Sequence, residues 1–177
     1  MKKFIIYTAL ALSVVACGKA NSFHIYGTVT SPELEGACIF LVPATEPVIE
    51  PTKENLDSTF IKDGKFEFHG TVERMADIRI ERGRRHNVQN LLVVTEPGTT
   101  EVIIGKVSSS KGTPQNDSLQ VWKDLTEEFH LQRSQTSDKA VKDSLRQAYN
   151  DRSRAIAEGC GPESTAGSFL LHMFPKK

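Results

Sequence analysis

The sequence predicts a mainly β fold with a helical C-terminal part: an antiparallel β-sandwich of about seven strands, followed by two to three helices. Two observations lead to this prediction. Short segments of alternating or continuous apolar residues recur between turn residues from Phe23 to about Val107, as they do in sandwich and barrel proteins. After Gly112 the apolar residues change to the spacing of amphipathic helices.

The composition is that of an ordinary globular chain and gives no sign of a nucleic-acid partner. The chain has 177 residues, of which 38% are hydrophobic and 25% charged, and its formal net charge is zero. Such a chain is long enough for one good core or two small ones. Nucleic-acid-binding proteins carry basic patches that meet phosphates. The sequence has no basic tract, so we expect no nucleic-acid partner.

The N-terminus is typical of an exported lipoprotein. Lys2 and Lys3 precede an apolar run from Phe4 to Ala16, which has the build of a signal peptide and is too short to span a bilayer as a mature helix. The end of the run, VVAC at residues 14–17, resembles the bacterial lipobox. In that motif the cysteine becomes the lipidated first residue of the mature chain.

The lipobox resemblance implies a signal peptide at residues 1–16, a lipid on Cys17 and a tether at residues 17–22 that holds the protein on the membrane. The alternative is an ordinary signal peptide in which Cys17 is incidental. The tether from Gly18 to Ser22 reaches only about 17 Å, so the first strand begins close to the headgroups. Gly18, where an Asp would be expected in an inner-membrane lipoprotein, implies by resemblance an outer-membrane protein. We expect it to face the periplasm, with the cell surface as the alternative.

The clearest strand signal is a hairpin over residues 57–72, DSTFIKDGKFEFHGTV. Its Asp63-Gly64 pair favours a two-residue type I′ turn, because glycine adopts positive φ without strain and aspartate tolerates it. This turn fixes the register of the two arms and places Thr59 opposite Phe68. One face of the hairpin is therefore expected in the core and the other in solvent.

The remaining strand segments fall into two classes. Strands buried on one face alternate apolar and polar residues, whereas strands covered on both faces are continuously apolar. The first class contains FHIYGTV, ADIRIER and TTEVIIG, and the second contains ACIFLV and LLVV. The proline-containing segment at residues 43–55 is interpreted as a projecting loop, which can bind partners.

Two long helices and one short helix are predicted after the strands. The first begins at Thr113-Pro114, since proline is tolerated in a first turn, and the second runs from Thr136 or Ser137 to near Gly159. We expect these two to pair as an antiparallel hairpin. Their inward residues are predicted to be Leu119, Trp122, Leu125 and Phe129, and Val141, Leu145, Ala148, Ala155 and Ile156.

The third helix is predicted through AGSFLLHMF, after Pro162, Glu163 and Ser164. Its density of apolar residues implies that it packs on the rest of the protein. The sequence therefore predicts a β-sandwich domain at residues 23–112 and a helical C-terminal region, residues 113–177, packed on it.

Several of these segments together resemble a known family. FHIYGTV, DSTFIKDGKFEFHGTV, LLVVTEPGTTEVIIG and GTPQNDSLQVW, in that order after a lipobox, are similar to domain-of-unknown-function family 4369, found in lipoproteins of Gram-negative bacteria. The resemblance covers about residues 23 to 130. In that family the domain commonly precedes a thioredoxin-like domain of the AhpC/TSA type, which we expect this chain to lack. The family has no agreed catalytic residues, so the resemblance implies an architecture, an anchor and a redox neighbourhood.

Two cysteines remain if Cys17 carries lipid. Cys38 lies in an apolar strand and is expected to be a small core residue. Cys160, in GCGPES, precedes a predicted helix, where backbone N–H groups favour a thiolate, and it resembles half of the thioredoxin Cys-Gly-Pro-Cys motif. Glu163 stands where that motif has its second cysteine. We therefore interpret Cys160 as part of a connecting loop, with a reactive thiol or a disulfide to Cys38 as alternatives.

The other candidate residues are histidines and arginines. The histidines show no metal-ligand spacing, so we expect no metal site, and we interpret His24 and His69 as an incidental pair on outward strand faces. The segment ERGRRH places Arg82, Arg84 and Arg85 at the tip of a predicted strand connection. They are candidates for contact with an anion or a lipid headgroup, and a solvated loop is the alternative.

No catalytic motif is present in the sequence. It lacks the Gly-x-Ser-x-Gly elbow and the phosphate-binding glycine loop, so we expect no catalytic residues and no cofactor. We predict a noncatalytic binding module that docks a protein or small ligand through the sandwich loops or the helical surface. The alternative is an accessory role in envelope thiol–disulfide exchange, through Cys160 or a separate thioredoxin-like partner. Cell-surface adhesion would rest on fold analogy alone.

Overall fold

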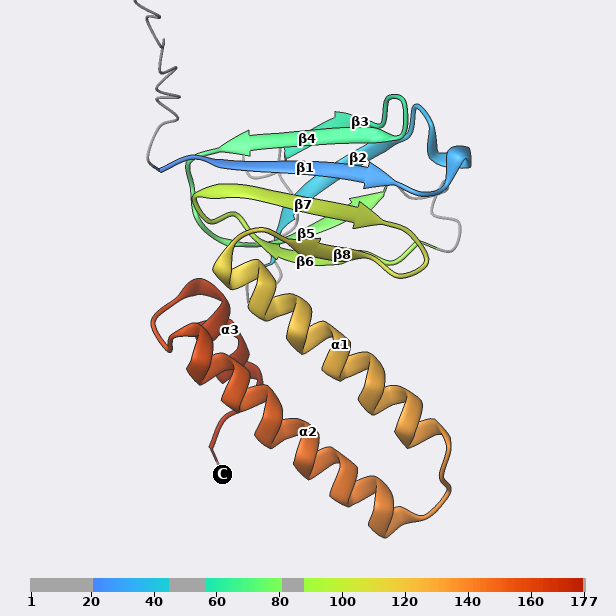
Figure 1. The fold of residues 1–177 in the computed structure, drawn as a ribbon, viewed down its shortest axis with the longest axis vertical. Helices are drawn as coiled ribbons and strands as arrows, with labels where there is room; N and C mark the ends of the chain where they lie inside the picture. Colours follow the sequence, from blue (N-terminus) through green and yellow to red (C-terminus); the bar gives the residue numbers. More distant parts are fainter. Residues whose placement is uncertain (1–20, 45–56, 81–87, 177) are drawn as a thin grey trace, which may run out of the picture.

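The computed structural model describes residues 21–44, 57–80 and 88–176, which form a β-sandwich followed by helices (Figure 1). These residues contain eight strands in two four-stranded sheets and three α-helices. The strands are β1 Phe23–Val29, β2 Cys38–Pro43, β3 Asp57–Phe60, β4 Lys65–Gly70, β5 Met75–Ile80, β6 Leu91–Val94, β7 Gly98–Ile104 and β8 Ser109–Lys111. The helices are α1 Pro114–Ser134, α2 Lys139–Cys160 and α3 Thr165–Met173, and a 3-10 turn, η1, covers Pro32–Leu34. The predicted fold class is confirmed.

The two sheets have matching orders. We call them the β1 sheet, in the order β4-β1-β7-β8, and the β2 sheet, in the order β3-β2-β5-β6. All strand neighbours pair antiparallel except β1 and β7, which run parallel from Phe23 opposite Gly98 to Val29 opposite Ile104. This parallel pair, which joins distant parts of the sequence, was not foreseen. Strand β8 was missed as well, because its sequence SSK has no apolar pattern.

The β3–β4 hairpin closes one edge of the sandwich. Asp63 and Gly64 have φ angles of +51° and +67°, as the predicted type I′ turn requires. Lys62 and Lys65 exchange two backbone hydrogen bonds, of 2.9 and 3.0 Å. Because β3 and β4 are edge strands of different sheets, the turn joins the two sheets at this edge.

The arms of the hairpin separate beyond the turn, so the predicted pairing of Thr59 with Phe68 is wrong. Thr59 lies opposite Ile39 of β2, and Phe68 lies opposite Ile25 of β1. A single two-stranded ribbon buries only one face of each arm and is marginally stable alone. Separation lets each arm extend a different sheet while Ile61 and Phe68 stay in the shared interior.

The main core lies between the two sheets. It includes Ile25 and Phe68 from the β1 sheet and Ile39 and Ile78 from the β2 sheet, all at most 2% exposed. Gly27 belongs to this packing as well, since a Cβ atom there would lie 2.0 Å from the Phe66 ring. The alternation predicted for the first strand is confirmed, with every odd-numbered residue of β1 buried.

The helices cover the opposite edge of the sandwich, where β6 and β8 are the edge strands (Figure 1). A second apolar cluster forms there. Met75 and Val94 of the β2 sheet pack with Leu119 of α1 and with Ala166 and Leu170 of α3. The continuous apolar run LLVV is explained by this arrangement, because β6 contributes side chains to both clusters.

The helix boundaries follow local capping signals. Helix α1 starts at Pro114 as predicted, and α3 starts after Ser164, whose Oγ accepts a hydrogen bond from Gly167 N. Helix α2 starts at Lys139, later than predicted, because Asp138 accepts hydrogen bonds from the backbone N–H groups of its first turn.

The inward face of α2 differs in part from the prediction. Its buried residues are Ser153 and Ala157, small side chains that allow close approach of the other two helices. Leu145 and Ile156 are half-buried, whereas three predicted inward residues are exposed: Val141, Ala148 and Ala155. The α1–α2 hairpin extends beyond the sandwich (Figure 1), so its distal half has no second layer to pack against. Along the described residues, no helix combines the length and the apolar character needed to cross a membrane.

Candidate binding pocket at the helix-covered edge

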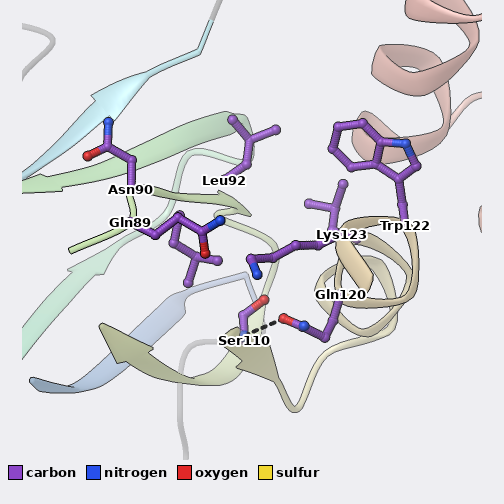
Figure 2. Close-up of a pocket in the computed structure, with 9 residues that line it drawn as sticks. Gln89, Asn90, Leu92, Ser110, Gln120, Trp122 and Lys123 are labelled. Carbon is purple, nitrogen blue, oxygen red and sulfur yellow. Dashed lines mark hydrogen bonds between the residues drawn. The ribbon is translucent and has the colours of Figure 1, made fainter. Parts of the chain in front are cut away.

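A cavity of about 150 Å³ lies where α1 meets the ends of β6 and β8 (Figure 2). We call it the edge pocket. It is lined by Gln89, Asn90, Leu91, Leu92, Ser110, Leu119, Gln120, Trp122 and Lys123. Residues from the two sheets and from α1 thus line one site. No single segment of the sequence predicts this site.

Asn116 fixes the first turn of α1 on the edge strand β6. Its side-chain carbonyl accepts a hydrogen bond of 2.9 Å from Val94 N, and its amide donates one of 2.8 Å to Val94 O. The buried Asn116 amide therefore pairs with the strand edge as a neighbouring strand would. This contact protects an otherwise open edge.

Glu96 caps the N-terminus of α1. Its Oε1 accepts hydrogen bonds from Gln115 N at 2.8 Å and Asn116 N at 3.1 Å. A carboxylate at this position satisfies exposed backbone donors and complements the helix dipole. Thr113 precedes the helix but makes no side-chain cap; its hydroxyl accepts instead from the Asn116 amide at 2.8 Å. Sequence reasoning missed the role of Glu96, which is far from the helix start along the chain.

Polar groups at β8 face the pocket. Ser110 N donates a hydrogen bond of 2.9 Å to Gln120 Oε1, and Gln120 Nε2 donates one of 2.7 Å to Asp124. Ser110 Oγ and Trp122 Nε1 are both shielded from solvent and have no hydrogen-bond partner among the described residues. Buried polar groups are nearly always paired, so the Ser110 hydroxyl marks the pocket as a place for a polar ligand. The Trp122 indole nitrogen lies on the side of its ring that faces away from the pocket (Figure 2).

One charged pair borders the pocket. Figure 2 shows Lys123 reaching from α1 toward Gln89 and Ser110, and its ammonium group forms an ion pair with Glu127. The hydrogen bond from Lys123 lowers the pKa of Glu127 below its usual value, and the Lys123 charge and the Gln89 amide add to this effect, while burial opposes it. The Lys123 side chain is 15% exposed, so its charge lies largely inside the structure.

The pocket can hold only a small group. Sites for drug-sized ligands enclose roughly 300–1,000 Å³, against about 150 Å³ here. That volume suits one polar group, such as an amide, a carboxylate or the side chain of a partner protein. The walls offer hydrogen-bond donors and acceptors beside apolar surface from Leu92, Leu119 and Trp122.

The described residues that the sequence singled out as site candidates are not among those that line the pocket. Cys17 and the arginines Arg82, Arg84 and Arg85 lie outside the described residues. Cys160 is the last residue of α2 and is half-buried. The sequence predicted a helix start just after it, but α3 begins only at Thr165. Ser164 Oγ lies 3.4 Å from the Cys160 sulfur, but it donates its hydrogen over the shorter distance of 2.7 Å to Gly161 O.

Cys38 is half-buried at the start of β2, whereas the sequence predicted a core position. Cys38 and Cys160 are not joined by a disulfide.

The family of the chain is shown by a family model. The model described as "Domain of unknown function (DUF4369)" matches residues 19–119, more than half of the chain, and the chain belongs to this family. The match spans the sandwich and ends inside α1, at the wall of the edge pocket. No curated protein and no solved structure matches the chain.

Proposed function

We propose that this member of the DUF4369 family is a lipoprotein of the outer membrane, held by a lipid on Cys17 and facing the periplasm, that acts as a noncatalytic binding module. The signal-type N-terminus and the VVAC segment at residues 14–17 support the anchor. The observation that carries the binding role is the edge pocket with the buried, unpartnered hydroxyl of Ser110.

The chemistry of the pocket supports binding over catalysis. Among its nine lining residues, Lys123 is the single titratable side chain, and it is paired with Glu127. Nucleophilic and acid–base catalysis need a base within about 3 Å of the reacting group. Ser110, the one hydroxyl residue in the lining, has Lys123 as its titratable neighbour there (Figure 2). The ion pair with Glu127 requires the protonated ammonium form of Lys123, which cannot act as a base.

The proposed ligand is a small polar group presented by a partner. Ser110 Oγ can donate one hydrogen bond and accept others, and the neighbouring apolar walls exclude water, which strengthens polar contacts. A pocket of this size binds the tip of a protein segment better than a complete metabolite.

Site-specific photocrosslinking in intact cells tests this proposal. A photoreactive amino acid replaces Asp124, an exposed residue that contacts Gln120 at the pocket wall. The matched control places it at Asp143, an exposed residue of α2. We expect a discrete adduct from position 124 and none from position 143. Ser110→Ala removes the buried hydroxyl and should reduce the adduct. Equal adducts at both positions, or an adduct insensitive to Ser110→Ala, would contradict the binding role.

The thiol-redox alternative stays a prediction with its own test. If Cys160 exchanges disulfides with a thioredoxin-like partner, it must react quickly with an alkylating reagent at neutral pH. Its half-buried position leads us to expect slow modification. Timed alkylation followed by mass spectrometry decides between these outcomes.

A further inference from the structure

Two histidines and a glutamate meet on the outer face of the β1 sheet. His24 of β1 lies directly opposite His69 of β4, and Glu67 lies two residues before His69 on the same face. Their neighbours Ile25 and Phe68 point into the core and are at most 2% exposed. The strand alternation therefore directs all three polar side chains outward from a rigid, fully packed backbone.

The three side chains are already close enough to share one ion. Glu67 Oε2 lies 3.4 Å from His24 Nε2 and 3.2 Å from His69 Nε2. The two imidazole rings stack at a centroid distance of 4.2 Å with an interplanar angle of 15°. All three ligand atoms lie within 4.8 Å of one another.

These separations fit a tetrahedral metal ion. Zinc bonds to nitrogen and oxygen of about 2.0–2.1 Å hold neighbouring ligand atoms roughly 3.3–3.5 Å apart. Both distances to the Glu67 oxygen, 3.4 and 3.2 Å, agree with this geometry. The nitrogen lone pairs lie in the planes of the two stacked rings, so the imidazole side chains must rotate out of the stack to direct both nitrogens at one ion.

His24 supplies an independent indication. Its Nε2 atom is shielded from solvent and forms no hydrogen bond within the described residues, although it lies 3.4 Å from the Glu67 oxygen. The contact with Glu67 has the distance of an ion pair without the alignment of a hydrogen bond. A metal ion between the two groups would satisfy both, because it bonds to the lone pairs of nitrogen and oxygen.

We propose that His24, Glu67 and His69 bind a divalent transition-metal ion, with Zn²⁺ as the ion that best fits the donor set. Two imidazoles and one carboxylate are typical zinc ligands, whereas Mg²⁺ and Ca²⁺ select sites made of oxygen atoms. Three protein ligands leave a fourth position for water or for a donor from a partner. The site is distinct from the edge pocket, which lies at the other edge of the sandwich.

Titration calorimetry with ZnCl₂ on the tag-free full chain, purified in detergent, tests the proposal. We expect one ion per chain, and a loss of affinity of at least about tenfold in His69→Gln and in Glu67→Gln, because each removes one ligand. His130→Gln is the matched control, since His130 is an exposed histidine of α1 outside the cluster. It should bind as the unchanged protein does.

Thermal unfolding separates ligand loss from misfolding. Glu67 and His69 are exposed side chains, so their variants should unfold at the wild-type temperature without metal. Zn²⁺ should raise the unfolding temperature of the wild type and leave that of His69→Gln nearly unchanged, while Mg²⁺ should affect neither. Absence of Zn²⁺ binding, or equal binding by the wild type and the double variant His24→Gln/His69→Gln, would overturn the proposal.

Discussion

The two edges of the sandwich are protected in different ways. At one edge the backbone itself joins the sheets through the tight turn at Asp63-Gly64. At the other edge α1 covers β6 and β8 with side chains, and Asn116 pairs with the exposed backbone of Val94. Unprotected edge strands invite aggregation, so both solutions serve stability. Side chains that cover a sheet edge can leave a pocket between them. The edge pocket lies at the helix-covered edge.

The largest effect is expected where the helices meet the sheets. Leu170 of α3 is fully buried in the second cluster, so Leu170→Ala should lower the free energy of unfolding by about 2–5 kcal/mol. Leu131→Ala, in the distal part of α1, is the control and should change it by less than about 0.5 kcal/mol, because Leu131 is 60% exposed. Urea unfolding followed by fluorescence of the single tryptophan, Trp122, measures both. Equal losses would mean that the helical hairpin packs differently.

The next effect concerns the polar contact at the same edge. Asn116→Ala leaves both Val94 N–H and Val94 C=O unpaired beneath α1, and we expect a loss of about 2–3 kcal/mol in the free energy of unfolding. Hydrogen exchange of the Val94 amide should accelerate in the same variant. Gln132→Ala is the control, since Gln132 is an exposed α1 side chain bonded to Glu128. An unchanged Val94 exchange rate would show that Asn116 does not hold the edge.

The turn at the opposite edge should respond more weakly. Gly64→Ala adds a Cβ atom that would lie 3.5 Å from Val29 O, an ordinary contact distance, on a residue with φ of +67°. We therefore expect a loss of about 1 kcal/mol in the free energy of unfolding, caused by backbone strain alone. Gly159→Ala is the matched control. Gly159 lies in α2 with open space around its Cβ position, and alanine there should stabilise by about 0.5 kcal/mol. Chemical unfolding measures both, and two changes of the same sign would contradict the turn geometry.

The smallest effect is electrostatic. Lys123 lowers the pKa of Glu127 in the folded protein, so this carboxylate stabilises the fold above its unfolded pKa, about 4.3, and the contribution disappears as the pH falls through the lower folded value. Glu127→Gln should therefore flatten the acid side of the stability profile slightly, because Glu127 is 42% exposed and screened by solvent. Unfolding free energies between about pH 5 and pH 3 measure it. A steeper acid loss in the variant would contradict the sign.

Local signals in the sequence predicted much of the fold. The Asp63-Gly64 turn, the helix start at Pro114 and the start of the third helix after Ser164 depend on neighbouring residues, and each was confirmed. The alternation of β1 was equally readable. The amphipathic pattern of α2 predicted the wrong residues for part of its inward face. Burial along this helix depends on how far the sandwich extends beside it.

Contacts between distant segments could not be predicted. Which strand pairs with each arm of the hairpin is decided by the packing of two sheets, and the cap that Glu96 gives α1 depends on β6 and β7 lying beside the helix start. The sequence indicated His24 and His69 as an incidental pair on outward strand faces. Their cluster with Glu67 was missed for the same reason, since the register of β1 against β4 places His24 opposite His69. The spacing of possible ligands along the sequence does not show that two strands bring them together.

The most direct test of the proposed lipoprotein is mass spectrometry of the N-terminal peptide from protein purified out of native membranes. We expect a mature chain that begins at Cys17 and carries covalent acyl chains, with residues 1–16 removed. A mature chain that retains residues 1–16, or one that begins at another residue with no lipid, would contradict the anchor on which the proposed function rests.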